Sequence, residues 1–258
     1  MFEDLHDDDE PVGRILTRRE AVIVLGSAGA AGFLSLTGCT SRSSDGNAMA
    51  ATTNKSGSVA TCAVKPAMTE GPYFVDERLD RADIRSDSTS REVKPGAALA
   101  LAFNVSRIQN GACTPLPGAQ VDIWHCDAMG VYSDANDPGF STRGQTWLRG
   151  FQTTKADGIA TFTTILPGWY RGRATHIHFK IRGKDAGGSP FDFTSQIFFD
   201  EEFLTSAYKL PPYNSRSDSG RTLNARDGIY NRGGSELLVT PSSVNGRYAA
   251  AFNIGLDV

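Results

Sequence analysis

The sequence predicts an all-β fold: a β-sandwich of mixed and antiparallel strands with long loops, preceded by a disordered leader and linker. Two observations support this prediction. Short runs of β-branched and aromatic residues recur between turn signals, and glycine is plentiful, with 27 residues in 258. No long amphipathic helix is evident after residue 60, and no repeat with a period of about 20–50 residues is apparent. Many short strands separated by turns are typical of a sandwich.

Six segments have the composition of strands. Each is a short, largely apolar run, and turn residues such as Pro117-Gly118 and Asp157-Gly158 stand beside them. In chain order the expected strands cover 98–105, 119–125, 158–165, 175–181, 195–199 and 247–254.

The segment 1–39 has the features of an export signal. Arg18 and Arg19 precede an apolar run rich in glycine and alanine, 21–36, which is the pattern of a twin-arginine signal. The stretch that ends at Cys39 is similar to a bacterial lipobox, in which Cys39 would be lipidated. The alternative is a transmembrane anchor, but a span needs about 20 apolar residues and this run is shorter. We therefore expect an extracytoplasmic protein, held as a periplasmic or cell-surface lipoprotein or released.

The remaining sequence divides into a linker and one domain. Residues 40–61 are rich in Ser, Thr, Ala, Asn and Gly, a composition typical of a flexible tether. Residues 62–258 are enough for a single domain with a full core. The net charge of −3 argues against a nucleic-acid partner. The only membrane contact we expect is the lipid at Cys39.

A pair of histidines is the strongest functional signal in the chain. His176 and His178 alternate with Ile177 and precede Phe179 and Ile181, which is a strand pattern. Because alternate residues of a strand share a face, the two imidazoles should point to one side and the apolar residues to the core. Two adjacent imidazoles form half of a metal site. Such a pair alone is more often incidental than metal-binding.

Two tyrosines complete a candidate metal site. Tyr170 ends a turn-like stretch before the histidine strand, and Tyr132 follows a turn at Met129-Gly130. A phenol has a pKa near 10 and ligates well only when a strongly charged ion displaces its proton. Fe(III) is the natural partner for two phenolates with two imidazoles. Zinc or copper held by His176, His178 and another group is the competing interpretation.

Several motifs in this chain resemble those of the intradiol ring-cleavage dioxygenases, the catechol and protocatechuate 3,4-dioxygenase family. The resemblance covers roughly residue 62 to the C-terminus, and the matching stretches stand in the family's order. They are 69–74, 116–125, 130–133, 149–150, 157–158, 165–170 and 173–178.

The resemblance implies a non-haem Fe(III) enzyme and names its ligands. The family's four ligand positions fall on Tyr132, Tyr170, His176 and His178. The substrates would be O2 and a catechol-type ring, cleaved between its hydroxylated carbons to a cis,cis-muconate-type diacid. Tyr170 would act as both ligand and base.

Four further residues match or adjoin the family's site. Arg173 matches the active-site arginine, which would stabilise negative charge on the substrate. Gln196 matches a glutamine that orients substrate or a ligand. Tyr73 and Trp169 are candidates for the substrate pocket, although both could be ordinary core or rim aromatics. His125 has the surroundings of a buried or capping histidine, and we do not expect it to be a ligand.

The cysteines predict one disulfide. If Cys39 is lipidated, Cys62, Cys113 and Cys126 remain, and an exported protein is expected to form a disulfide. We favour Cys62–Cys113, with Cys62–Cys126 as the alternative.

Alternatives remain at this level. A non-catalytic β-sandwich surface protein that binds aromatics or polysaccharide would share the fold, but would not need four ligands. The physiological catechol and the oligomeric state are left open. Arg143, Arg149 and Arg171 are candidate partners for a substrate carboxylate.

Overall fold

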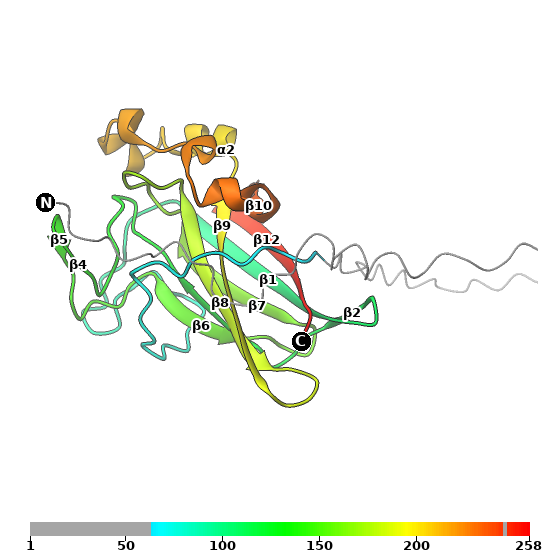
Figure 1. Ribbon diagram of the computed structural model, residues 1–258. Coiled ribbons are helices and arrows are strands. Elements are labelled where there is room, and N and C mark those ends of the chain that lie inside the picture. The colour runs from blue at the N-terminus through cyan, green and yellow to red at the C-terminus, as the bar shows by residue number, and fades with distance from the viewer. Residues whose placement is uncertain (1–62, 245–246) are drawn as a thin grey trace, which may run out of the picture.

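The protein is described by a computed structural model that covers residues 63–244 and 247–258 (Figure 1). The predicted export signal, 1–39, with Cys39, the linker 40–61 and Cys62 lie outside the described residues.

Two five-stranded sheets form the body of the molecule. One has the order β11 (Ser242–Val244), β12 (Arg247–Leu256), β1 (Ala98–Gln109) and β2 (Ala112–Pro115), with β7 (Ile159–Ile165) also paired to β1. The other has the order β10 (Leu238–Val239), β9 (Pro190–Phe199), β8 (His176–Lys184), β3 (Gln120–Trp124) and β6 (Arg149–Thr153). A small hairpin joins β4 (Asn136–Asp137) to β5 (Phe140–Ser141).

The predicted all-β fold is confirmed, and so is the mixed strand pairing. β12 runs parallel to β1, whereas β8 is antiparallel to both of its neighbours, β3 and β9. Each of the six predicted strands overlaps an observed one. The sequence missed β2, β4, β5, β6, β10 and β11, because strands of two to five residues are too short to establish an alternating pattern.

Aromatic and aliphatic side chains from both sheets meet in one core. Phe103 of β1, Phe179 of β8 and Phe252 of β12 form a triangle, with ring centroids 5.3 to 5.8 Å apart. Such ring pairs add to the free energy gained by burying their area. This packing fixes β8, the strand that carries both histidines.

The two faces of β8 differ from the prediction in one respect. Ile177, Phe179 and Ile181 face the core as expected. The opposite face is also buried: His176 and His178 are 2% and 1% exposed. The reason is that loops cover this face, and periodicity within a strand cannot reveal loops that are distant in sequence.

Helical segments gather at one end of the sandwich (Figure 1, orange). They are α2 (Glu201–Ala207) and the 3-10 helices η1 (Tyr213–Ser215), η2 (Asp218–Gly220), η3 (Asn224–Arg226), η4 (Tyr230–Arg232) and η5 (Gly234–Leu237). Asp200 caps α2 by accepting hydrogen bonds from the amides of Glu202 and Phe203, both at 3.0 Å. Among the described residues, no helix has the length and hydropathy of a membrane span.

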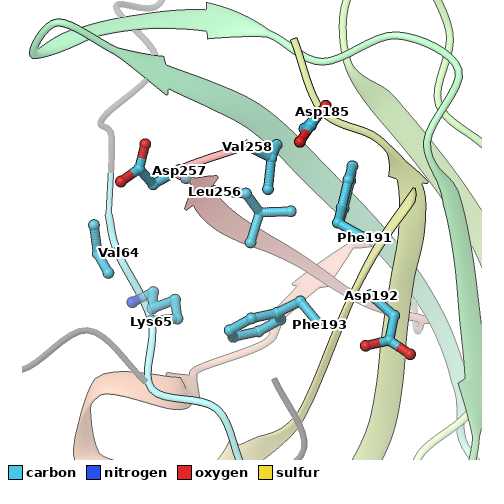
Figure 2. Close-up of a pocket in the computed structure, with 10 residues that line it drawn as sticks. Val64, Lys65, Asp185, Phe191, Asp192, Phe193, Leu256, Asp257 and Val258 are labelled. Atoms are coloured by element: carbon cyan, nitrogen blue, oxygen red, sulfur yellow. The ribbon is translucent and has the colours of Figure 1, made fainter. Parts of the chain in front are cut away.

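A pocket of about 200 Å³ lies where β9 meets the C-terminal end of β12 (Figure 2). Phe191 and Phe193 of β9 face Leu256 and the C-terminal Val258 across it. Phe193 and Phe191 pair with Ile181 and Gly183, three and five residues along β8 from His178, so the pocket starts roughly 10 Å from that histidine.

Candidate metal centre

The two histidines present their Nε2 atoms to each other. His176 Nδ1 donates to the carbonyl of Ala174 at 2.6 Å, which leaves its Nε2 with a free lone pair. The Nε2 atoms of His176 and His178 are 3.0 Å apart. Both side chains therefore direct a potential ligand atom to the same point.

Packing rather than hydrogen bonding orients His178. Its ring stacks on Trp124, its cross-strand neighbour on β3, with centroids 5.0 Å apart and planes at 5°. On another side lies Gly71, where a Cβ atom would come within 3.1 Å of His178 Cε1. The Nδ1 atom of His178 is buried without a hydrogen-bond partner. Trp124 was not predicted, since cross-strand register cannot be read from one strand.

Both predicted tyrosines reach the histidine pair. The phenol oxygens of Tyr132 and Tyr170 are each 3.4 Å from His176 Nε2. Tyr132 is 1% exposed and Tyr170 is partly buried. Four potential ligand atoms, two nitrogens and two oxygens, thus converge from three segments of the chain.

Two glycines allow the tyrosine-bearing turns to approach each other. A Cβ at Gly130 would lie 2.3 Å from the carbonyl oxygen of Trp169, and one at Gly168 would lie 2.2 Å from that of Ala128. Gly168 also donates to the carbonyl of Asp127 at 3.0 Å. No residue with a side chain could bring the two turns this close without displacing the backbone.

Arg216 holds the same two turns together from outside. Its guanidinium donates to the carbonyl of Met129 and, at 2.9 Å, to that of Trp169. It also lies over the indole of Trp169, 3.8 Å from the ring centroid. Sequence reasoning missed Arg216, since it is more than 45 residues from either turn.

Burial favours the uncharged form of every donor in this group. It raises the pKa of Tyr170 to about 12 and that of Tyr132 further, because a phenolate would be poorly solvated there. It lowers the pKa of both His176 and His178 well below the usual value. Neutral imidazoles keep their lone pairs available, whereas the phenols need a strong positive charge to ionise.

The donor set fits a hard, highly charged cation. Two imidazole nitrogens and two phenol oxygens satisfy an ion that prefers oxygen and tolerates nitrogen. Among the described residues, no cluster of three or more His, Cys, Asp and Glu side chains is present. Zinc sites are built from Cys, His, Asp and Glu, whereas two phenols beside two imidazoles are the donor set that suits a trivalent ion.

Arg173 and Gln196 lie together beside this centre. Arg173 Nη2 donates to Gln196 Oε1 at 2.5 Å, and Gln196 Nε2 donates to the carbonyl of Thr69 at 2.9 Å. The positive charge of Arg173 lowers the pKa of Tyr132 and Tyr170, although burial outweighs it. The geometry agrees with the predicted roles of Arg173 and Gln196, which stay predictions.

The two pocket candidates lie on different sides of the tyrosines. Tyr73 stacks on Tyr132, with centroids 4.4 Å apart, and its hydroxyl donates to Asp137 at 2.7 Å. Trp169 packs against Arg216 and Gly220 of the C-terminal segment. Tyr73 thus adjoins a predicted ligand, and Trp169 supports the turn before one.

The three arginines considered for a substrate carboxylate have different surroundings. Arg149 is buried, and its guanidinium binds the Ser133 hydroxyl and carbonyl, the Tyr73 carbonyl and Glu77. Its donors are therefore committed to the protein. Arg143 and Arg171 are exposed.

His125 behaves as expected for a structural histidine. It is buried, and its two ring nitrogens hydrogen-bond the carbonyl of Cys126 at 2.8 Å and the hydroxyl of Thr164 at 2.7 Å. It has no nitrogen left for a metal.

The cysteine prediction is partly settled. Cys113 is disulfide-bonded and Cys126 is a free, buried thiol, so the alternative pair Cys62–Cys126 is wrong. The Cys126 thiol is instead packed with Trp124 and Tyr132 and donates to the carbonyl of Gly168 at 3.5 Å. The favoured partner, Cys62, lies outside the described residues, and Cys62–Cys113 stays a prediction.

Comparison with known proteins identifies the family. A family model described as "Dioxygenase" matches residues 69–209, more than half of the chain. The intradiol ring-cleavage dioxygenase of Tetranychus urticae is 30% identical with a TM-score of 0.63; the alignment covers 76% of this chain and 95% of that one. This chain belongs to the intradiol ring-cleavage dioxygenases. The predicted family is confirmed.

Two further solved structures are similar to this chain. The dioxygenase domain of a dioxygenase carbohydrate-binding protein fusion from Streptomyces sp. SirexAA-E is 30% identical, with a TM-score of 0.52, over 76% of this chain and 99% of that one. Catechol 1,2-dioxygenase from Pseudomonas arvilla shares the fold at 22% identity and a TM-score of 0.51, over 75% of this chain and 62% of that one. A search of curated protein sequences gives no match.

Proposed function

We propose that this protein is a non-haem Fe(III) intradiol dioxygenase. It cleaves a catechol-type ring with O2 between the two hydroxylated carbons and yields a cis,cis-muconate-type diacid that retains both oxygen atoms. The observation that carries the proposal is the convergence of Tyr132, Tyr170, His176 and His178 within one buried group. Membership of the family supports the same chemistry.

The four side chains would hold the ion, and their environment suits its charge. Bound Fe(III) would ionise the two phenols, chelate the catechol oxygens and draw electron density that makes the ring reactive toward O2. Two phenolates reduce the net charge of the ion from three to one. The neutral imidazoles add no charge, in line with the lowered pKa of each.

Tyr170 is placed to move a proton. Burial raises the pKa of Tyr170 to about 12, so its phenolate would be a strong base toward a catechol hydroxyl. Tyr170 is also the less buried of the two tyrosines. Its Oη would take the proton of one catechol hydroxyl as the substrate binds.

Arg173 supplies a positive charge beside the reacting ring. Its side chain is 16% exposed and its guanidinium is fixed by Gln196 and Asp227. A preorganised cation stabilises negative charge that develops on the ring during oxidation, and does so without reorganisation. Trp124, Tyr73 and the backbone at Gly71 restrict water around His178 and Tyr132.

The decisive experiment is a visible absorption spectrum of the purified, iron-loaded protein, before and after anaerobic addition of catechol. We expect a broad tyrosinate-to-iron band that moves to longer wavelength with catechol. Admitting O2 should then consume one O2 per catechol and give a product with the mass of both reactants. Tyr132→Phe is the matched control, since it removes one ligand atom and keeps the ring. A colourless protein with bound zinc would support the competing metal, and one without any metal would support the binding module.

We also propose that the enzyme works outside the cytoplasm, anchored by a lipid on Cys39. The twin-arginine pattern and the disulfide-bonded Cys113 support this, since disulfides persist in oxidising compartments. Membrane fractionation of cells that express the wild type and Cys39→Ser tests it. The wild type should sediment with membranes and the variant should be soluble; equal distribution would contradict the proposal.

A further inference from the structure

Asp227 is a buried carboxylate that accepts four hydrogen bonds beside the candidate metal centre. It lies after η3 and is 1% exposed. One carboxylate oxygen, Oδ1, accepts from the amides of Ile229 and Tyr230, at 2.7 and 3.2 Å. The other, Oδ2, accepts from Arg173 Nε at 3.0 Å and from the Ala174 amide at 2.7 Å.

The contacts of Asp227 define the direction in which Arg173 points. Asp227 holds the Nε edge of the guanidinium while Gln196 holds Nη2. A planar guanidinium gripped at two positions has little freedom to rotate. The remaining donors of Arg173 are therefore aimed by its two partners.

The same oxygen reaches a predicted ligand through one residue. The Ala174 amide donates to Asp227 Oδ2, and the Ala174 carbonyl accepts from His176 Nδ1 at 2.6 Å. A charged hydrogen bond at the amide fixes the peptide that in turn fixes the imidazole. Asp227 thus contacts Arg173 directly and also holds the peptide that orients His176.

We propose that Asp227 is the positioning residue of this site, which aims the Arg173 guanidinium at the substrate and couples it to the segment that carries His176. The proposal rests on the proposed function, since it assigns a catalytic consequence to Arg173. A carboxylate is required because only it can accept four hydrogen bonds and balance a cation that is largely removed from water.

A double-mutant cycle tests the assignment on the full-length, iron-loaded enzyme. Asp227→Asn, Arg173→Gln and the double variant are compared for kcat and KM with catechol, iron content, and anaerobic catechol affinity by visible absorption. We expect Asp227→Asn to lower kcat by roughly 10- to 100-fold, since a misdirected cation loses most of its stabilising effect. Iron content should stay near that of the wild type. Asp227→Asn should cause no further loss in the Arg173→Gln background.

Asp87→Asn is the matched control. Asp87 is another buried carboxylate that organises a loop, accepting from the amides of Thr89, Ser90 and Thr146 at 2.7 to 2.9 Å. It has no contact with Arg173, so its replacement should lower thermal stability and leave kcat unchanged. If Asp227→Asn does not fold, Asp227→Ser is used in its place. The smaller serine side chain fits the site, and its hydroxyl can still accept a hydrogen bond from one backbone amide.

The outcomes separate the two proposals. Additive losses of kcat in the double variant, or wild-type kcat in Asp227→Asn, would overturn the role of Asp227 while leaving the dioxygenase intact. Equal losses of kcat in Asp87→Asn and Asp227→Asn would also overturn it. If the wild type shows no ring cleavage, the proposed function fails; the coupling of Asp227 to Arg173 is then measured on thermal stability, where additivity would refute it.

Discussion

Replacing Arg149 with methionine should destabilise the protein and weaken its metal centre together. The guanidinium of Arg149 donates to Ser133 Oγ and the Tyr73 carbonyl, both at 2.8 Å, and to the Ser133 carbonyl. Glu77 lies 3.6 Å away. Arg149→Met keeps the approximate length of the side chain and removes every one of these donors.

The magnitude follows from what the substitution leaves behind. Each buried acceptor without a donor costs about 1–3 kcal/mol. Removing one partner of a buried charge pair typically costs about 3–5 kcal/mol in all. Because Arg149 is 3% exposed, solvent does little to offset this, and we expect a loss of about 3–5 kcal/mol. For a domain of this size the melting temperature should fall by about 6–20 °C.

The assay combines chemical denaturation with iron titration. Ser133 follows Tyr132, and Tyr73 stacks on it, so losing the clamp should also displace the Tyr132 phenol and lower iron affinity. Arg143→Met is the control, since an exposed arginine should change stability by less than about 0.5 kcal/mol. A loss below about 1 kcal/mol in Arg149→Met, or full iron affinity in the destabilised variant, would refute this reasoning.

Three further predictions concern protons, backbone and metal. Burial lowers the pKa of His125 to about 4, whereas the unfolded value is near 6.5. The neutral imidazole therefore contributes about 3 kcal/mol of stability above pH 6.5, and this contribution is lost as the pH falls toward 4. Near pH 5, unfolding of His125→Gln should take up about one proton fewer than unfolding of the wild type. Gly168→Ala should lower the free energy of unfolding by about 1–3 kcal/mol through overpacking and abolish the visible absorption band of the iron-loaded protein. Gly228→Ala is the control, because its Cβ would enter open space and should change neither. With free iron at about 1,000 times its Kd, the bound ion should stabilise the folded protein by about 4 kcal/mol, and removing the iron with a chelator should abolish this gain. An unchanged melting temperature after chelation would contradict metal binding in the folded state.

The sequence identified the four predicted ligands but little of what holds them in place. The alternation from His176 to Ile181 correctly predicted a strand with two histidines on one face. The family motifs selected Tyr132 and Tyr170, and the structure brings both hydroxyls within 3.4 Å of His176. The burial of the histidine face was not predictable, since Trp124 and Gly71 reach it through strand register and a loop.

The sequence could not reveal the charged contacts that join residues distant along the chain. Asp227 is more than 50 residues from Arg173 in sequence, and nothing around it forms a recognisable motif. A single carboxylate in a loop is most often a solvated surface group. Only its burial and its four partners distinguish it. The same holds for Arg149. The sequence suggested it as a partner for a substrate carboxylate, whereas in the structure its guanidinium binds the carbonyls of Tyr73 and Ser133.

One arrangement recurs on each segment that carries a predicted ligand. Arg149 binds the carbonyl of Ser133, next to Tyr132; Arg216 binds the carbonyl of Trp169, next to Tyr170; Asp227 binds the amide of Ala174, two residues before His176. Each contact pairs a charge with the main chain, which is stronger and more directional than a neutral hydrogen bond. The sandwich core alone could not impose this order, because only the histidines lie on a strand. The loops around the metal centre are therefore held by charges fixed to their backbone, and its geometry should depend on these residues as strongly as on the ligands.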